Sequence, residues 1–418
     1  MLMLFLGRSL GFDSGMFASW VYAAPFLGGL FRFFLPMILE RWPARKKLCI
    51  QFYVLQVAAL WLLLGSTLLI PGTPGFCLGL KAVLLLSFWA LASLCENLAY
   101  LIFISWNGAL FPRRTLGRFY ARREVRKLGG EICALIFSGL GLHFWASQYP
   151  DGHFPPALEF SLYVLLAFLG SCFILGNTLF FRKIPEVLFE GTRITAASTG
   201  AVSRTRRFLQ EFQRLAQPFR NRAFRPLLLY GACFSFFLQL EQVSQFAFTA
   251  SLANGVVLPF FFMFSLRLVT RGGQCLAAPL VGRWVDRFGT LRVMMVSQFL
   301  TAFGILFYVF AEPQTSWFLY VSAFIWVSYV GLNSALPKVQ LEFANSPDDT
   351  PWLAAYAIVG SAMGCAGNFI GGWLYETYGA RPHFFETLFL CATFWRAALA
   401  LPIFVAQWRL NASRTPTH

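Results

Sequence analysis

The stretch Gly282-Arg-Trp-Val-Asp286-Arg287-Phe-Gly289-Thr-Leu-Arg292 lies between two long apolar runs. Gly282 lets two helix ends approach closely, and Gly289 permits a tight turn that a residue with a Cβ would resist. Asp286 can accept hydrogen bonds from backbone N–H groups at the start of a neighbouring helix, or it can pair with Arg287 or Arg292. The stretch therefore predicts a charged hairpin between membrane helices, which can be latched to another helix.

The composition around this hairpin is that of a membrane protein. Hydrophobic residues make up 57% of the 418 residues and charged residues only 12%, whereas an average soluble domain has about 25% charged residues. A transmembrane helix needs about 20 predominantly apolar residues. Such runs occur at about 16–39, 48–70, 80–106, 128–147, 158–181, 227–250, 256–281, 291–311, 316–336, 352–374 and 384–407. The sequence thus predicts an all-α, polytopic transmembrane helical bundle with about eleven full spans.

The basic residues indicate the orientation of the chain. When alternate loops are assigned to one side of the membrane, that side receives 27 of the 34 Lys and Arg residues. The positive-inside rule makes this side cytoplasmic. We therefore expect a multi-pass protein of the cell (inner) membrane with a cytoplasmic C-terminus. The net charge of +16 comes from these loops rather than from one folded patch, so we expect no nucleic-acid partner.

The hairpin resembles the Gly-x-x-x-Asp-Arg-x-Gly-x-x-Arg signature of the major facilitator superfamily, which lies on the cytoplasmic side between consecutive helices. A simpler alternative is that any positive-inside loop collects Gly and Arg. In the first part of the chain, Glu40-Arg41 and the following basic cluster stand where the family's first copy of the signature belongs. The glycines are missing there, so we expect that copy to be degenerate or differently built.

A second stretch carries the same resemblance. Pro112-Arg-Arg-Thr-Leu-Gly117-Arg118-Phe-Tyr is similar to the Pro-x-x-x-Arg-Gly-Arg-Phe/Tyr stretch between helices four and five of many bacterial facilitators, with Leu116 in place of the first Arg. A polybasic loop facing the lipid headgroups explains the same residues. Near the end of the chain, Gly360 to Gly372 places small residues on one helix stripe, which predicts tight helix packing.

The resemblance implies a fold of two six-helix halves. We expect an N-terminal bundle at 1–181, a cytoplasmic linker at 182–226, a C-terminal bundle at 227–407 and a cytoplasmic tail at 408–418. The opening residues Met-Leu-Met-Leu-Phe-Leu-Gly look like the end of a first helix followed by an external loop. We therefore expect helix one to be incomplete.

Ionisable residues inside the apolar runs are the candidate site residues, because each costs about 2.5–3.5 kcal/mol on insertion scales. Glu241 is the first candidate, since Glu241 and Gln245 lie one helical turn apart and face one direction; Gln242 is their neighbour. These groups could bind one substrate or pass a proton. The alternative is that Glu241 is a structural partner for an arginine of a neighbouring helix.

Other candidates lie elsewhere in the runs. Glu96 with Asn97 could bind or couple, and Arg32 and Arg267 could hold an anionic substrate, although an arginine can also pair structurally or extend to the interface. Arg396 lies in the last run. We expect two further charged residues, Glu131 and Arg271, to lie close to the membrane interfaces, so we do not assign them to the site.

The resemblance implies a secondary active transporter of a small solute, working by alternating access with or without proton coupling, as a monomer in the lipid bilayer. One alternative is a degenerate facilitator that serves as a sensor or scaffold. A second is a polytopic membrane enzyme, but the four histidines fall in no catalytic spacing. The nine scattered cysteines have no paired spacing, and no phosphate-binding loop occurs. We therefore expect neither a metal nor a cofactor.

Overall fold

The structure is a computed structural model that describes residues 15–69, 76–111, 115–147, 156–187, 213–214, 216–254, 259–343 and 350–414. Every element in these ranges is a helix, so the prediction of an all-α bundle is confirmed. The opening segment that suggested an incomplete first helix lies almost wholly outside the described residues, as does most of the expected linker. We call α2–α7 the first half of the molecule and α10–α18 the second half.

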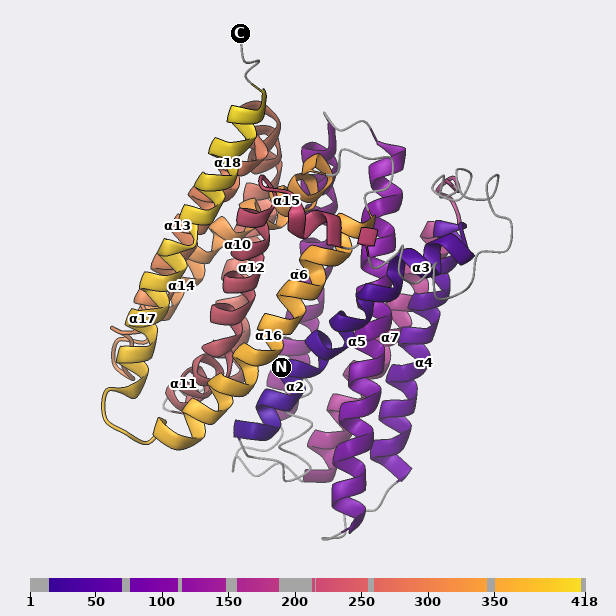
Figure 1. The fold of residues 1–418 in the computed structure, drawn as a ribbon. Coiled ribbons are helices and arrows are strands. Elements are labelled where there is room, and N and C mark those ends of the chain that lie inside the picture. The colour runs from indigo at the N-terminus through magenta and orange to yellow at the C-terminus, as the bar shows by residue number, and fades with distance from the viewer. Residues whose placement is uncertain are drawn as a thin grey trace.

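The helices of the first half run in long antiparallel rods (Figure 1). They are α2 (Gly15–Leu30), the 3₁₀ turn η1 (Phe31–Phe34), α3 (Leu35–Arg41), α4 (Arg45–Leu69), α5 (Phe76–Leu110), α6 (Leu116–Ser147) and α7 (Pro156–Phe181). The helices of the second half are α10 (Arg225–Leu240), α11 (Gln242–Asn254), α12 (Pro259–Phe288), α13 (Thr290–Leu306), α14 (Phe318–Ile325), η3 (Trp326–Ser328), α15 (Tyr329–Phe343), α16 (Thr350–Tyr378), α17 (Phe384–Ala398) and α18 (Ala400–Arg414).

When helices that continue one another are counted together, these elements form eleven rods within the described residues. Seven of the rods are long and apolar enough to cross a membrane by length and composition, and α13 is a shorter apolar helix. The long helices α6 and α12 are not among these seven, and charged residues cluster along part of their length. The outer faces expose large apolar side chains, such as Phe137, Phe173 and Leu276, each at least 76% exposed. Such a surface suits lipid rather than water, as in a multi-pass membrane protein.

Two helix pairs join the halves, α2 with α16 and α6 with α12. In Figure 1, α16 crosses the molecule beside α2. Along this pair, the Trp20 and Phe369 rings lie 4.6 Å apart between centroids. In the other pair, the Cys275 thiol of α12 donates to the Val125 carbonyl of α6 at 3.7 Å. The halves therefore touch along whole helices rather than at one point.

The glycine stripe predicted from Gly360 to Gly372 packs as expected. A Cβ added at Gly367 or Gly371 would overlap the carbonyl oxygens of Phe236 and Leu240 in α10. These glycines therefore let the backbones of α10 and α16 approach closely. The close approach places α16 between α10 of its own half and α2 of the other half.

Candidate functional site

A cavity of about 290 Å³ opens among the helices of the second half. Its walls come from α10, α11, α12, α14, η3, α15 and α17, together with the turn after α13. They mix apolar, aromatic, amide and arginine side chains, among them Phe246, Met263, Arg267, Arg271, Gln274, Tyr308, Trp326, Tyr329, Asn333 and Arg396. An apolar hollow with a few convergent polar groups is the usual form of a small-molecule site.

Arg267 is the cation most available to a ligand in this cavity. It lies on α12, within a predicted membrane run, yet it is solvent-exposed because it borders the cavity. No described residue forms an ion pair with it. The Tyr22 hydroxyl of α2 faces Arg267 and Gln242 from the first half. An anionic partner would stabilise a charged guanidinium in the wall of this cavity.

Arg396 also borders the cavity, but it already has a partner. Its guanidinium forms an ion pair with Glu241, and the two side chains are only 4% and 1% exposed. Glu241 stands at the break between α10 and α11 and does not line the cavity, whereas Gln242 and Gln245 do. The backbone N–H of Gln245 donates to the Glu241 carbonyl at 2.8 Å, so the two residues lie one helical turn apart as expected, but only Gln245 lines the cavity. The geometry is that of the alternative interpretation, a structural partner for an arginine of a neighbouring helix.

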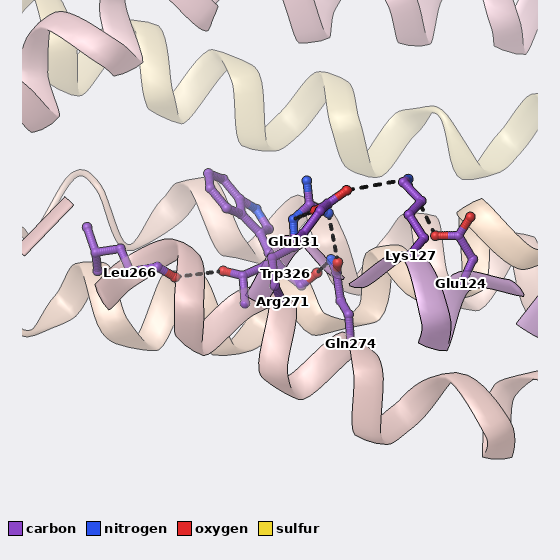
Figure 2. A network of polar contacts seen from close by, with 8 residues as sticks. Glu124, Lys127, Glu131, Leu266, Arg271, Gln274 and Trp326 are labelled. Carbon is purple, nitrogen blue, oxygen red and sulfur yellow. Dashed lines mark hydrogen bonds and ion pairs between the residues drawn. The ribbon is translucent and has the colours of Figure 1, made fainter. Parts of the chain in front are cut away.

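A third arginine, Arg271, joins the cavity to the first half. Its Nε lies 2.9 Å from a carboxylate oxygen of Glu131 on α6, and its Nη1 donates to Gln274 at 3.0 Å. Gln274 in turn donates to the Trp326 carbonyl at 3.0 Å. Figure 2 shows this chain of contacts continuing from Glu131 to Lys127 on the same helix. Glu131 and Arg271, which the sequence did not assign to the site, therefore meet at the cavity.

The charges around the cavity do not balance. Three arginines border it, and two carboxylates pair with two of them. Among the residues that the structure describes, one positive charge, that of Arg267, is left over. The aromatic side chains Tyr308, Trp326 and Tyr329 form much of the remaining wall, but a chain with 49 Phe and 13 Trp residues offers no sequence signal that would single them out.

The candidates from the first half form a separate polar group. Arg32, on the 3₁₀ turn, donates to the Asn97 side chain of α5, and Asn97 donates to the Pro25 carbonyl at 3.0 Å. Glu96 accepts from Gln56 at 3.3 Å. None of these residues is among those that line the 290 Å³ cavity. The structure brings Arg32 and Asn97 together but keeps them apart from Arg267.

The signature hairpin makes a junction of three helices. Asp286 on α12 lies 2.9 Å from the Lys338 ammonium of α15. It also accepts from the backbone N–H of Arg118, near the start of α6, at 3.2 Å. Its ion-pair partners among the described residues are Lys338 and Arg118 rather than Arg287 or Arg292. Lys338, forty-six residues beyond the hairpin's end, carried no signal in the sequence.

The glycines around Asp286 allow this contact. A Cβ at Gly282 would overlap the Cβ of Ala121, and one at Gly117 would overlap an Asp286 carboxylate oxygen. The chain turns between α12 and α13 at Gly289, whose φ is +93°, a conformation that other residues rarely adopt. Arg287 lies over the ring of its neighbour Phe288.

The first copy of the signature is built differently. Arg41 lies over the Trp42 ring, 5.2 Å from its centroid, and the side chain of Glu40 lies outside the described residues. Lys46, at the start of α4, donates from its ammonium to the carbonyls of Arg182 and Ile184 at 2.7 and 2.8 Å. This loop is therefore tied to the end of α7 in its own half.

Comparisons with known proteins place this architecture. No family profile matches the sequence, and no curated protein matches it significantly. Solved structures do match. The nucleoside transporter NupG has 14% sequence identity and a TM-score of 0.59, with 97% of this chain and 94% of that chain covered.

Two further transporters match to the same extent. The human organic anion transporter MFSD10 (TETRAN) has 13% identity and a TM-score of 0.61, with 97% of this chain and 88% of that chain covered. The xylose transporter XylE from E. coli, in a partially occluded inward-open conformation, has 13% identity and a TM-score of 0.59, with 98% and 95% covered. These matched structures are transporters rather than enzymes. The chain thus has the fold of the major facilitator superfamily transporters.

Proposed function

We propose that this protein is a secondary transporter that carries a small organic anion with a single negative charge across the membrane. The observation that carries the proposal is Arg267, an exposed arginine without an ion-pair partner among the described residues, in the wall of the cavity. One negative charge on the substrate balances the one positive charge left over there. A neutral solute would leave that charge unpaired.

The rest of the wall supports an organic body on this anion. Tyr308, Trp326 and Phe246 offer apolar surface, while Gln242 and Gln245 offer amide groups. Aromatic rings bury a large apolar area and carry a polar handle in Tyr and Trp. The matched proteins are a nucleoside transporter, an organic anion transporter and a xylose transporter. Because one fold carries many substrates, the choice of an anion rests on Arg267 and not on these likenesses.

The mechanism that fits is alternating access between the halves, 1–181 and 227–407, joined by the linker 182–226. The Asp286 junction ties α12 and α15 of the second half to α6 of the first. It lies at the end of the molecule that holds the basic loops, which the positive-inside rule makes cytoplasmic. We propose that this junction holds the cytoplasmic side closed in one state. The working unit is a monomer of the cell membrane with its C-terminus inside.

The test is uptake into proteoliposomes of benzoate, 4-hydroxybenzoate and lactate, with uridine and xylose as neutral solutes. We expect uptake of an aromatic monocarboxylate, and at least a tenfold loss of apparent affinity in Arg267→Gln, because a charge-assisted hydrogen bond contributes about 1.5–3 kcal/mol. Arg267→Lys should keep part of the affinity. Arg126→Gln, which removes an exposed arginine of α6, is the matched control. Uptake of uridine or xylose alone, unaffected by Arg267→Gln, would contradict the proposal.

Coupling to protons is tested in the same vesicles through Glu241. Glu241→Gln leaves the Arg396 charge buried without its partner, a change that costs about 3–5 kcal/mol in buried pairs. If Glu241 is structural, the thermal midpoint falls and Glu241→Gln/Arg396→Gln restores it. If Glu241 carries the proton, the folded Glu241→Gln protein exchanges anion but no longer accumulates it against a pH gradient. Glu96→Gln tests the candidate of the first half in the same assay.

Absence of uptake and binding for every anion and neutral solute, with folded protein, would favour the degenerate facilitator that acts as a sensor or scaffold.

A further inference from the structure

We infer that the bound anion displaces Glu131 from Arg271, so that occupation of the cavity releases one contact between the two halves. The inference rests on the proposed function, since it needs an anion in the cavity. It adds a mechanism by which the substrate itself starts the movement. Glu131 is then a positioning residue that acts through Arg271 on the interface between α6 and α12.

Arg271 belongs to the interface and to the cavity at once. Its Nε lies 2.9 Å from Glu131 of the first half, and its side chain lines the cavity of the second half. Arg267 and Arg271 are four residues apart on α12, and residues at this spacing face the same way on a helix. A carboxylate held by Arg267 therefore reaches the neighbourhood of the guanidinium that Glu131 occupies.

The guanidinium of Arg271 already has donors engaged with Glu131 and Gln274. It has five N–H donors in a planar fork; Glu131 lies at the Nε edge and Gln274 accepts from Nη1. A second carboxylate on the same fork would repel Glu131, because like charges this close to each other interact unfavourably. The carboxylate that enters the cavity therefore weakens the hold of Arg271 on Glu131.

When Glu131 leaves Arg271, a second cation is within its reach. Lys127, one turn earlier on α6, already lies 3.8 Å from its carboxylate. Figure 2 shows Glu131 between Lys127 on one side and Arg271 on the other. The Arg271 and Glu131 side chains are 29% and 34% exposed, so neither charge is stranded in a dry interior when they separate. The Arg396–Glu241 pair, only 4% and 1% exposed, lacks this freedom and is unsuited to such an exchange.

Release of this contact loosens a long interface. Val125 and Cys275 meet across the same helix pair, and Gly139 approaches Phe264 further along it. A ligand shifts a conformational equilibrium only by its different affinity for the two states. Here the difference arises because Arg271 is free to bind the anion fully only when Glu131 has left it. The anion thus favours the state in which α6 and α12 are apart.

The experiment uses the full chain in nanodiscs with 4-hydroxybenzoate as probe. Val125→Cys places a thiol opposite the natural Cys275, and dibromobimane reports when the two are joined; the unsubstituted chain gives the background from the other cysteines. We expect the anion to slow joining at least threefold. With Glu131→Gln added, joining should be slow from the start and unaffected by the anion, while the anion binds as tightly as before or more tightly. Glu312→Gln, a change of the same kind in a distant loop, should behave like the parent.

A second measurement leaves the interface unaltered. In the natural sequence, the anion should raise the rate at which N-ethylmaleimide modifies Cys275, and Glu131→Gln should raise that rate without anion. Binding of the anion with unchanged joining and unchanged modification would overturn this inference while leaving the proposed function intact. Weaker binding in Glu131→Gln would overturn it as well. Failure of the natural chain to bind any anion would overturn both.

Discussion

Two loops occupy corresponding places in the two halves, and they are held in opposite ways. The hairpin 282–292 reaches across the molecule, because its Asp286 accepts from the Arg118 backbone of the other half while pairing with Lys338 of its own half. The loop 40–47 stays within its half. Lys46 donates from its backbone to Glu186 at 2.9 Å and from its side chain to carbonyls at the end of α7.

The helix that precedes this loop, α3, borders the other half through apolar contact. Leu35 and Leu39 of α3 belong to a buried cluster that includes Leu341, Leu353 and Ala357 of the second half. Apolar packing is non-directional and tolerates small sliding movements. A hydrogen-bonded ion pair depends on the position of its atoms, so the same movement breaks it. The Asp286 side of the contact between the halves can therefore act as a latch, and the α3 side as a sliding surface.

The largest effect on uptake is expected from Asp286→Asn, which removes the proposed latch and so abolishes the difference between the two loops. The Lys338 ammonium, 8% exposed, would lose its nearest counter-charge, and an unpaired buried charge costs several kcal/mol. We expect 4-hydroxybenzoate uptake to fall at least tenfold. Uptake should fall less in Asp286→Glu, which keeps the charge but lengthens the side chain. Equal uptake by the parent and Asp286→Asn would contradict the role of Asp286 as a latch.

An intermediate effect is expected from Gly117→Ala, which leaves every charge in place. The added Cβ would overlap an Asp286 carboxylate oxygen, so the carboxylate must move away from Arg118. We expect a three- to tenfold loss of uptake. Gly129→Ala on the same helix is the matched control, because a Cβ there meets nothing within 4 Å; it should leave uptake unchanged and stabilise α6 by up to about 1 kcal/mol. If both substitutions lower uptake alike, helix flexibility rather than the latch is responsible.

The smallest effect is expected from Glu186→Gln in the contact of the first loop. Its carboxylate accepts from the Lys46 backbone at an exposed place within one half, so the loss should be no more than about 1 kcal/mol of stability. Uptake should stay within twofold of the parent, as measured beside Asp286→Asn. A loss of uptake as large as that of Asp286→Asn would show that both loops act as latches.

The sequence was sufficient for the parts of the fold that depend on local pattern. Apolar runs of membrane length predicted the rods, and the order of Gly and Asp between 282 and 292 predicted the hairpin turn at Gly289. The identity of the partners did not follow, because Lys338 approaches Asp286 only once α15 has packed beside α12. Hydrophobic length says where a helix crosses the membrane but not which neighbour it meets.

The cavity shows the same limit. Arg267 was a candidate because it interrupts an apolar run, and it does face the cavity. Glu131 and Arg271 were expected near the membrane interfaces, where a charged side chain can extend to the headgroups, and no local pattern pairs them with each other. Their pairing depends on the register of α6 against α12, to which residues such as Cys275 and Val125 contribute. That register is a property of tertiary packing.

The most direct test of the latch is the distance between the halves at the basic end. Spin labels on unnatural residues at Arg122 of α6 and Arg283 of α12, both exposed, would report it by double electron–electron resonance in nanodiscs. The account predicts that Asp286→Asn shifts the distribution to longer distances, while Glu186→Gln leaves the parent distribution unchanged. Identical distributions in the parent, Asp286→Asn and Glu186→Gln would contradict it.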